Sequence, residues 1–210
     1  MNAPTVEFDA DLHRYTVAGE VLPSVTTILQ VVNPIRGAMA AAARGTEVHR
    51  LTEVYDLGQS EPVPAELAGY IVAYVNFLRD HNFEPLHIEE RVHHPEHLYA
   101  GSLDRIGVLH RDLAVVDIKT GMIRPVTGLQ LAAYQEAWNW NQYPREQVTH
   151  RYALHLHDDS TYDLIEYGDP DDFKRFLACL TLHEWLKANR APADYDQPMV
   201  ANKRKMQQIG

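Results

Sequence analysis

The stretch AVVDIKTG, residues 114–121, begins as an apolar strand and then places an acid, Asp117, two residues before a base, Lys119. Side chains at positions i and i+2 of a strand point to the same face of a sheet, so the carboxylate and the ammonium share one side. The simplest interpretation is an ion pair at a sheet edge, because a short apolar run ending in Asp-x-Lys is a loose pattern. The surrounding sequence has to decide between that pair and a functional site.

The segments around this strand predict an α/β protein. Strands are expected over 86–94, 99–110 and 113–120, then a helix over about 129–141, then strands over 147–157 and 161–168. The second and third strands should pair as an antiparallel hairpin around the turn HRD. A last helix of about eighteen residues should follow, capped by Asp169 or Asp171.

An N-terminal hairpin and a helical region precede this core. The short runs VEF (6–8), HRYTV (13–17) and VLP (21–23) predict strands, and Ser24 is the expected N-cap of a helix over 25–32. Longer helices are expected over about 36–55 and 64–81. We therefore expect one domain, made of an N-terminal hairpin with a short helix (1–35), a core (36–190) and a loosely held polar tail (191–210).

The composition limits the protein's location and its chemistry. No run approaches the roughly 20 apolar residues that cross a bilayer, and the start lacks the basic and apolar regions of a leader, so we expect a cytoplasmic protein without a membrane partner. The single cysteine, Cys179, cannot form an internal disulfide or a cysteine-ligated cluster, and its apolar neighbours predict a buried thiol. Any metal must be held by oxygen and imidazole ligands.

The net charge counts against broad adhesion to nucleic acid. The chain has 19 Lys and Arg against 29 Asp and Glu, a net charge of −10, whereas phosphate binding rests largely on Lys and Arg. A site for divalent cations, in contrast, needs carboxylates. Basic residues are still concentrated locally, at Arg36, Arg44 and Arg50 and in the tail at Lys203, Arg204 and Lys205.

A second carboxylate, Asp104 in the segment GSLDRIG, is expected close to Asp117. If their strands pair around the HRD turn, the two side chains meet across the ladder, where opposite residues lie about 5 Å apart. Two adjacent like charges repel, so a buried pair needs a shared proton or a cation, and hard oxygen ligands suit Mg²⁺ or Mn²⁺. Lys119 would then be the fixed positive side chain beside the pair.

An acid on one strand followed by acid-x-lysine on the next resembles the PD-(D/E)XK nuclease superfamily, with Asp104, Asp117 and Lys119 in the motif positions. The segment YAGSLDRIG (99–107) is similar to the A-G-[ST]-x-D form of the first acidic motif. The segment HRYTVAGEVLPSVTTIL (13–29) is similar to the opening of phage-type exonucleases and of mitochondrial genome maintenance exonucleases.

Two accessory motifs resemble those of the RecB-like branch. RGTEVHRLTE (44–53) is similar to its G-x-x-x-H helix, with His49 at the histidine. LQLAAYQEA (129–137) is similar to its Q-x-x-x-Y helix, with Gln130 and Tyr134 one turn apart on a single face. Taken alone, His49 is more simply a packed histidine that pairs with Glu53, and Gln130 and Tyr134 a polar helix edge. The motifs occur in the family's order, which makes the set far more specific than any member.

The resemblance implies a restriction-endonuclease-like core, with a mixed central sheet flanked by helices. It implies a metal-dependent DNA exonuclease of recombination, repair or phage replication, with one or two Mg²⁺ or Mn²⁺ ions and no iron–sulfur cluster. The ligands would be Asp104, Asp117, His49 and the carbonyl of Ile118. Lys119 would orient the attacking water and, if burial and the nearby metal lowered its pKa, assist the deprotonation of that water. Gln130 and Tyr134 would position the DNA backbone or a metal-bound water, while Arg124 and the early arginines would contact phosphates.

Several alternatives stay open. A structure-specific endonuclease could use the same core, and a catalytically silent nucleic-acid-binding module could keep the fold. Substrate entry could depend on a homo-oligomer or on a recombination partner protein. Glu89 and Glu90 face opposite sides of their strand, so at most one joins the site, and the spacing before Val92 favours Glu89.

Other residues with suggestive chemistry receive simpler interpretations. The groups His93, His94, His97 and His155, His157 have metal-ligand spacing, but we interpret both as solvated histidines at strand ends. Trp138 and Trp140 are interpreted as core or rim residues rather than as platforms for base stacking.

Overall fold

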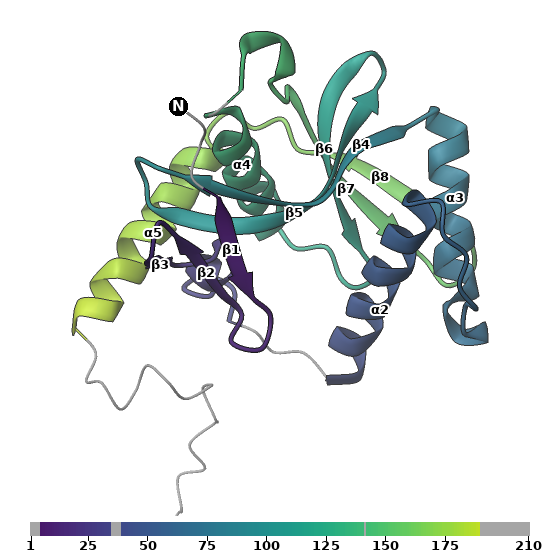
Figure 1. Ribbon diagram of the computed structural model, residues 1–210, viewed down its shortest axis with the longest axis horizontal. Helices are drawn as coiled ribbons and strands as arrows, with labels where there is room; N and C mark the ends of the chain where they lie inside the picture. Colours follow the sequence, from purple (N-terminus) through teal and green to yellow (C-terminus); the bar gives the residue numbers. More distant parts are fainter. Residues whose placement is uncertain (1–4, 35–38, 141, 190–210) are drawn as a thin grey trace, which may run out of the picture.

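A mixed five-stranded sheet forms the centre of the structure, a computed structural model that describes residues 5–34, 39–140 and 142–189 (Figure 1). The strands lie in the order β4 (Glu84–His94), β5 (Tyr99–Leu109), β6 (Asp112–Lys119), β7 (His150–Leu156) and β8 (Tyr162–Glu166). Strands β6 and β7 are parallel, and the other neighbours are antiparallel. The expected α/β class, with a mixed sheet flanked by helices, is confirmed.

Helices cover both faces of this sheet (Figure 1). One face packs against α1 (Val25–Leu29), α4 (Val126–Asn139) and α5 (Asp172–Asn189), and the other against α2 (Met39–Asp56) and α3 (Ala68–His81). Because side chains alternate along a strand, Val115 of β6 enters the first core while Val116 and Ile118 enter the second. The continuous apolar run before Asp117 is therefore a strand buried on both sides.

A separate three-stranded antiparallel sheet confirms the expected N-terminal hairpin. It consists of β1 (Val6–Asp9), β2 (Arg14–Val17) and β3 (Glu20–Leu22). The residues between β2 and β3, Ala18 and Gly19, have φ angles of 50° and 85°, as a two-residue turn that follows the strand twist requires. Side chains of this sheet pack on Ala100 of β5, and Tyr15 Oη lies 3.1 Å from Ser102 Oγ.

Most differences from the expected element boundaries have local causes. Ser24 caps α1 as expected, accepting a hydrogen bond of 3.0 Å from the Thr27 amide. The helix ends at Leu29 rather than at 32, because the following amides bond to carbonyls three residues back. Strand β7 begins at His150 rather than at 147, because side chains of Gln135 and Asn139 take the backbone groups of Val148.

The remaining helices also differ at their first turns. Residues Ala65–Leu67 form a 3₁₀ turn before α3, and α4 begins at Val126 rather than at 129. Before α5, Asp169 Oδ1 accepts the Asp171 amide at 2.9 Å, which closes a turn outside the helix, so the side-chain cap by Asp169 or Asp171 stays a prediction. No helix in the described ranges has both the length and the apolarity that a membrane span demands.

Two interpretations of buried residues have opposite outcomes. Cys179 is a buried core thiol, as expected. The interpretation of His93 and His94 as solvated residues is wrong, because both are buried. His94 packs against the rings of Tyr99 on β5, Trp140 just after α4 and Phe173 on α5. The position of His94 at a strand end did not reveal these surroundings. The expected tail (191–210), its three basic residues and Arg36 lie outside the described residues.

Candidate functional site

The site lies where β5 and β6 separate. These strands pair from Leu109 and Asp112 as far as Arg105 and Val116, and β6 then continues to Lys119 beside β7. The turn between them, His110 and Arg111, has φ angles of 53° and 81°, so the expected hairpin is confirmed with a two-residue loop. Past the last pair, Asp104 Oδ2 accepts the Ile118 amide at 2.6 Å, so a side chain replaces the strand partner.

Asp117 and Lys119 form a close charge contact on the sheet face that carries α4. Lys119 Nζ lies 2.6 Å from Asp117 Oδ2 and 3.4 Å from Gln130 Oε1. Gln130 Nε2 donates to Asp117 Oδ1 at 3.1 Å and to Tyr134 Oη at 3.3 Å. The helix over residues 126–139 therefore fixes the strand motif, as the one-turn spacing of Gln130 and Tyr134 predicts.

His49 reaches the same point from α2. Its Nε2 lies 3.0 Å from the Ile118 carbonyl oxygen, and its Nδ1 lies 3.5 Å from Asp104 Oδ1. These contacts, rather than the alternative pair with Glu53, define the surroundings of the ring. The structure thus brings together every residue that the resemblance placed in the site.

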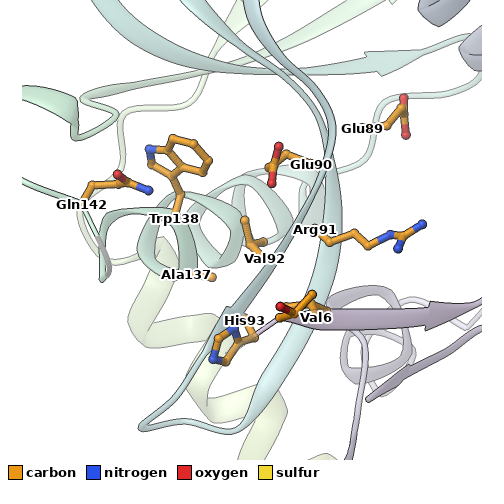
Figure 2. Close-up of a pocket in the computed structure, with 10 residues that line it drawn as sticks. Val6, Glu89, Glu90, Arg91, Val92, His93, Ala137, Trp138 and Gln142 are labelled. Carbon is orange, nitrogen blue, oxygen red and sulfur yellow. The ribbon is translucent and has the colours of Figure 1, made fainter. Parts of the chain in front are cut away.

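Glu89 is the glutamate that joins the site. Its Oε1 lies 3.9 Å from His49 Nδ1, whereas Glu90 lies near His87, with 3.7 Å between Oε2 and Nδ1. Figure 2 shows Glu90 on the side of β4 that carries Trp138, with Glu89 pointing away from it. Glu89 has a φ angle of 50° inside a strand, an uncommon conformation for a residue with a side chain, of a kind that gathers at functional sites.

Arg105 supports this group from behind and was missed by the sequence interpretation. Its guanidinium is fully buried and donates to Asp56 Oδ2 at 2.6 Å and to Glu89 Oε1 at 3.0 Å. It also donates to the Asp104 carbonyl at 2.7 Å and to Thr52 Oγ1 at 3.1 Å. The sequence feature that could have indicated this role is an arginine in a mostly apolar strand, next to the motif acid Asp104.

The electrostatics of the cluster favour a cation. Burial opposes the ionisation of Asp104, but the charges of His49 and Lys119 and the Ile118 amide lower its pKa to about 2. Burial raises the pKa of Asp117 to about 6, with Asp104 adding to the effect and Lys119 opposing it. Burial also works against the charge on His49, yet Asp104 and Glu89 raise its pKa to about 10. Positive charge between the acids is therefore stabilised strongly.

Lys119 is held as an ammonium. Burial disfavours its charge, but Asp117 and Asp104 outweigh that effect and raise its pKa. The two carboxylates act against the lowered pKa that proton transfer by Lys119 would need. That role depends on burial together with a nearby metal and stays a prediction. As an ammonium, the side chain is suited to stabilising negative charge.

The donor set fits a hard divalent cation. His49, Glu89 and Asp104 each offer a ligand atom, and these three atoms lie within 4.8 Å of one another. Asp117 Oδ2 is a buried oxygen that faces the Lys119 ammonium at 2.6 Å. Carboxylate oxygens with one imidazole are ligands that Mg²⁺ or Mn²⁺ can use. Glu89 is the addition to the expected ligands.

A glycine couples the first acidic motif to the helix motif. A Cβ atom on Gly101 would come within 2.7 Å of Tyr134 Cε1. Only a residue without a side chain lets β5 pass so close to this ring. The glycine of the A-G-S-x-D segment thus positions Tyr134, whose hydroxyl accepts from Gln130.

The arginines expected at phosphates have partners within the chain. Arg50 pairs with Glu47 and Glu61, each at 2.7 Å, and Arg124 donates to Asn33 Oδ1 at 2.8 Å. Arg44 lies over the Tyr70 ring. Their contact with phosphate stays a prediction.

A cavity of about 480 Å³ adjoins the site between β1, β4 and the end of α4 (Figure 2). Trp138 lines it with most of its surface buried, as expected for a core residue, and its Nε1 donates to the Glu146 carbonyl at 3.1 Å. Trp140 is a rim residue, about half exposed.

Comparison with known proteins finds distant structural likeness alone. The chain matches no protein family model, and no curated protein matches it. An alkaline exonuclease from Laribacter hongkongensis is similar over 77% of this chain and 80% of its own, with 16% identity and a TM-score of 0.41. The protein SSO0001 is similar over 70% of this chain and 68% of its own, with 15% identity and a TM-score of 0.35.

Proposed function

We propose that this chain is a divalent-metal-dependent nuclease of the PD-(D/E)XK type, which hydrolyses phosphodiester bonds of DNA. The observation that carries the proposal is the meeting of Asp104, Asp117 and Lys119 where β5 and β6 separate. An edge ion pair, the simpler interpretation of Asp-x-Lys, does not account for a second buried carboxylate, a histidine and a glutamine converging on the same point.

The residues fit the requirements of phosphodiester cleavage. Water attacks phosphorus in line with the leaving oxygen, and negative charge gathers on the phosphoryl and leaving oxygens. A bound Mg²⁺ or Mn²⁺ supplies an activated water and neutralises this charge. Asp104, Asp117 and His49 would hold it, with the Ile118 carbonyl and Glu89 as further oxygen ligands. Binding has to release the proton that His49 carries between its acidic neighbours.

Lys119 and the helix residues have separate tasks. The Lys119 ammonium lies beside the acids and would bind the attacking water and a phosphoryl oxygen as charge develops. Gln130 contacts both Asp117 and Lys119, so it would keep the two in register with the substrate. Tyr134 limits the rotation of Gln130 through the bond between its hydroxyl and the amide.

Exonuclease action on DNA ends is preferred because the segment 13–29 is similar to the opening of exonucleases. We place such an enzyme in recombination, repair or phage replication in the cytoplasm, as one domain with a polar tail. An endonuclease on the same core is the second candidate. With a net charge of −10, DNA entry would rest on a homo-oligomeric channel or on a partner protein.

A degradation assay tests the proposal. Its substrates are end-labelled linear DNA, both single- and double-stranded, and closed circular DNA. Each substrate is incubated with Mg²⁺, Mn²⁺ or EDTA and with wild type, Lys119→Ala or the control Lys187→Ala on α5. An exonuclease degrades linear DNA with metal, spares circles and loses activity in Lys119→Ala alone. Cut circles would favour the endonuclease. If nothing is cut under any condition, the silent binding module becomes the better account.

A further inference from the structure

The β7–β8 hairpin carries a second group of metal-type side chains, away from His49. His155 of β7 is paired with Asp163 of β8 in the antiparallel register, so their side chains share one face. His157 lies two residues beyond His155, and its amide bonds to the Thr161 carbonyl at 3.0 Å, which continues the same pairing. The alternation of a strand therefore places both imidazoles and the carboxylate together.

The separations of these atoms match those of ligands around one small ion. Asp163 Oδ2 lies 2.9 Å from His157 Nε2 and 3.9 Å from His155 Nδ1, and the three ligand atoms lie within 4.8 Å of one another. Ligands bound tetrahedrally at about 2.0–2.1 Å are about 3.3 Å apart, within this range. We propose that His155, His157 and Asp163 form a zinc-type transition-metal site, with a fourth position for water or another oxygen ligand.

The two imidazoles distinguish this group from an ordinary histidine–carboxylate pair. Their rings lie 4.3 Å apart, so both cannot carry a proton without repulsion. A different arrangement occurs at the other end of the hairpin, where one imidazole lies between two acids. His150 lies 3.0 Å from Glu166 and 3.8 Å from Asp112.

The hairpin group is distinct from the proposed catalytic group, although it shares a sheet face with Lys119. His155 is the parallel partner of Lys119, one strand away from it. The hairpin group shares no ligand with His49, Glu89 and Asp104. Two imidazoles with one carboxylate favour Zn²⁺ or a similar ion, whereas the carboxylate-rich catalytic group favours Mg²⁺ or Mn²⁺. The inference therefore stands whether or not the chain cleaves DNA.

Titration calorimetry with Zn²⁺ tests the site on the full chain without a histidine tag. The parent protein carries His49→Gln and Asp104→Asn, which remove two ligands of the proposed catalytic group. Three further proteins each add one substitution to this parent: His157→Gln, Asp163→Asn or the control His150→Gln. Loss of a direct ligand should weaken binding at least about 100-fold, because loss of a partner behind a ligand already costs 10- to 100-fold. His150→Gln should bind as the parent does.

Three results would overturn the inference. The parent could bind no Zn²⁺, the two ligand variants could bind as tightly as the parent, or His150→Gln could lose as much affinity as they do. Thermal unfolding without metal checks that each variant is folded. Added Zn²⁺ should then raise the midpoint of the parent and of His150→Gln but leave His157→Gln and Asp163→Asn unchanged.

Discussion

Replacement of Arg105 by methionine should lower the free energy of unfolding by about 3–5 kcal/mol, because it leaves a buried carboxylate without its cation. Arg105 and Asp56 are 0% and 1% exposed as side chains, and their atoms lie 2.6 Å apart. Tyr74 Oη still donates to Asp56 at 2.6 Å, which places the loss toward the lower end of that range. Glu89 also loses a donor, so the site should loosen in the same variant.

Urea unfolding followed by far-ultraviolet circular dichroism measures this loss, with Asp56→Leu and the double variant completing a cycle. Arg105→Met leaves Asp56 without its cation, and Asp56→Leu leaves Arg105 with Glu89 as its remaining carboxylate. The double variant removes both members of the buried pair, so its loss should be smaller than the sum of the two. Arg50→Met is the matched control, since Arg50 also binds two carboxylates but in water, and its effect should be far smaller. A loss below about 1 kcal/mol for Arg105→Met, or additive single effects, would show that the buried pair is not coupled in this way.

Three further outcomes are expected. Lys119→Arg should cut DNA about 100-fold or more slowly than wild type in the same end-label assay, because a planar guanidinium cannot replace a compact ammonium in the space beside Asp117. Gly101→Ala should lower the free energy of unfolding in urea by about 1–3 kcal/mol, because the new methyl group overlaps the Tyr134 ring. Gly121→Ala is the control, since a methyl group there meets open space and should not lower it. Equal losses in the two variants would contradict this expectation. His94 has its pKa lowered to about 4 by burial and then by His97 and His93, so the unfolded chain binds its proton first. Stability should therefore fall as pH drops from about 6.5 to about 4, by up to about 3 kcal/mol, and His94→Gln should flatten that part of a pH series of unfolding curves.

The strand and helix pattern was predictable because it depends on near neighbours in the sequence. The apolar run before Asp117, the HRD turn and the Ser24 cap each report a local preference, and each is confirmed. The motif residues were predictable as a group through the resemblance, and the structure brings them together, although their roles stay predictions. The approach of Asp104 to Asp117 required that β5 and β6 pair. The approach of His49 and Gln130 also required α2 and α4 to pack against the sheet.

Features that depend on distant parts of the chain were not predictable. The partners of Arg105 come from α2 and β4, 49 and 16 residues away. The burial of His94 was not predictable because two of the rings that cover it, Trp140 after α4 and Phe173 on α5, are distant in the sequence. The left-handed backbone at Glu89 has no signal in its residue type, since glycine or asparagine is the usual occupant of that conformation.

The close approach of Gly101 to Tyr134 also constrains how this sequence can change over time. A larger residue at Gly101 is blocked while the tyrosine is present, whereas a smaller residue at Tyr134 leaves space that a side chain at Gly101 could then fill. Substitutions at these two positions therefore have an order, with the helix position changing first. A smaller residue at Tyr134 also removes the hydroxyl that accepts from Gln130, so these two positions, 33 residues apart, depend on each other.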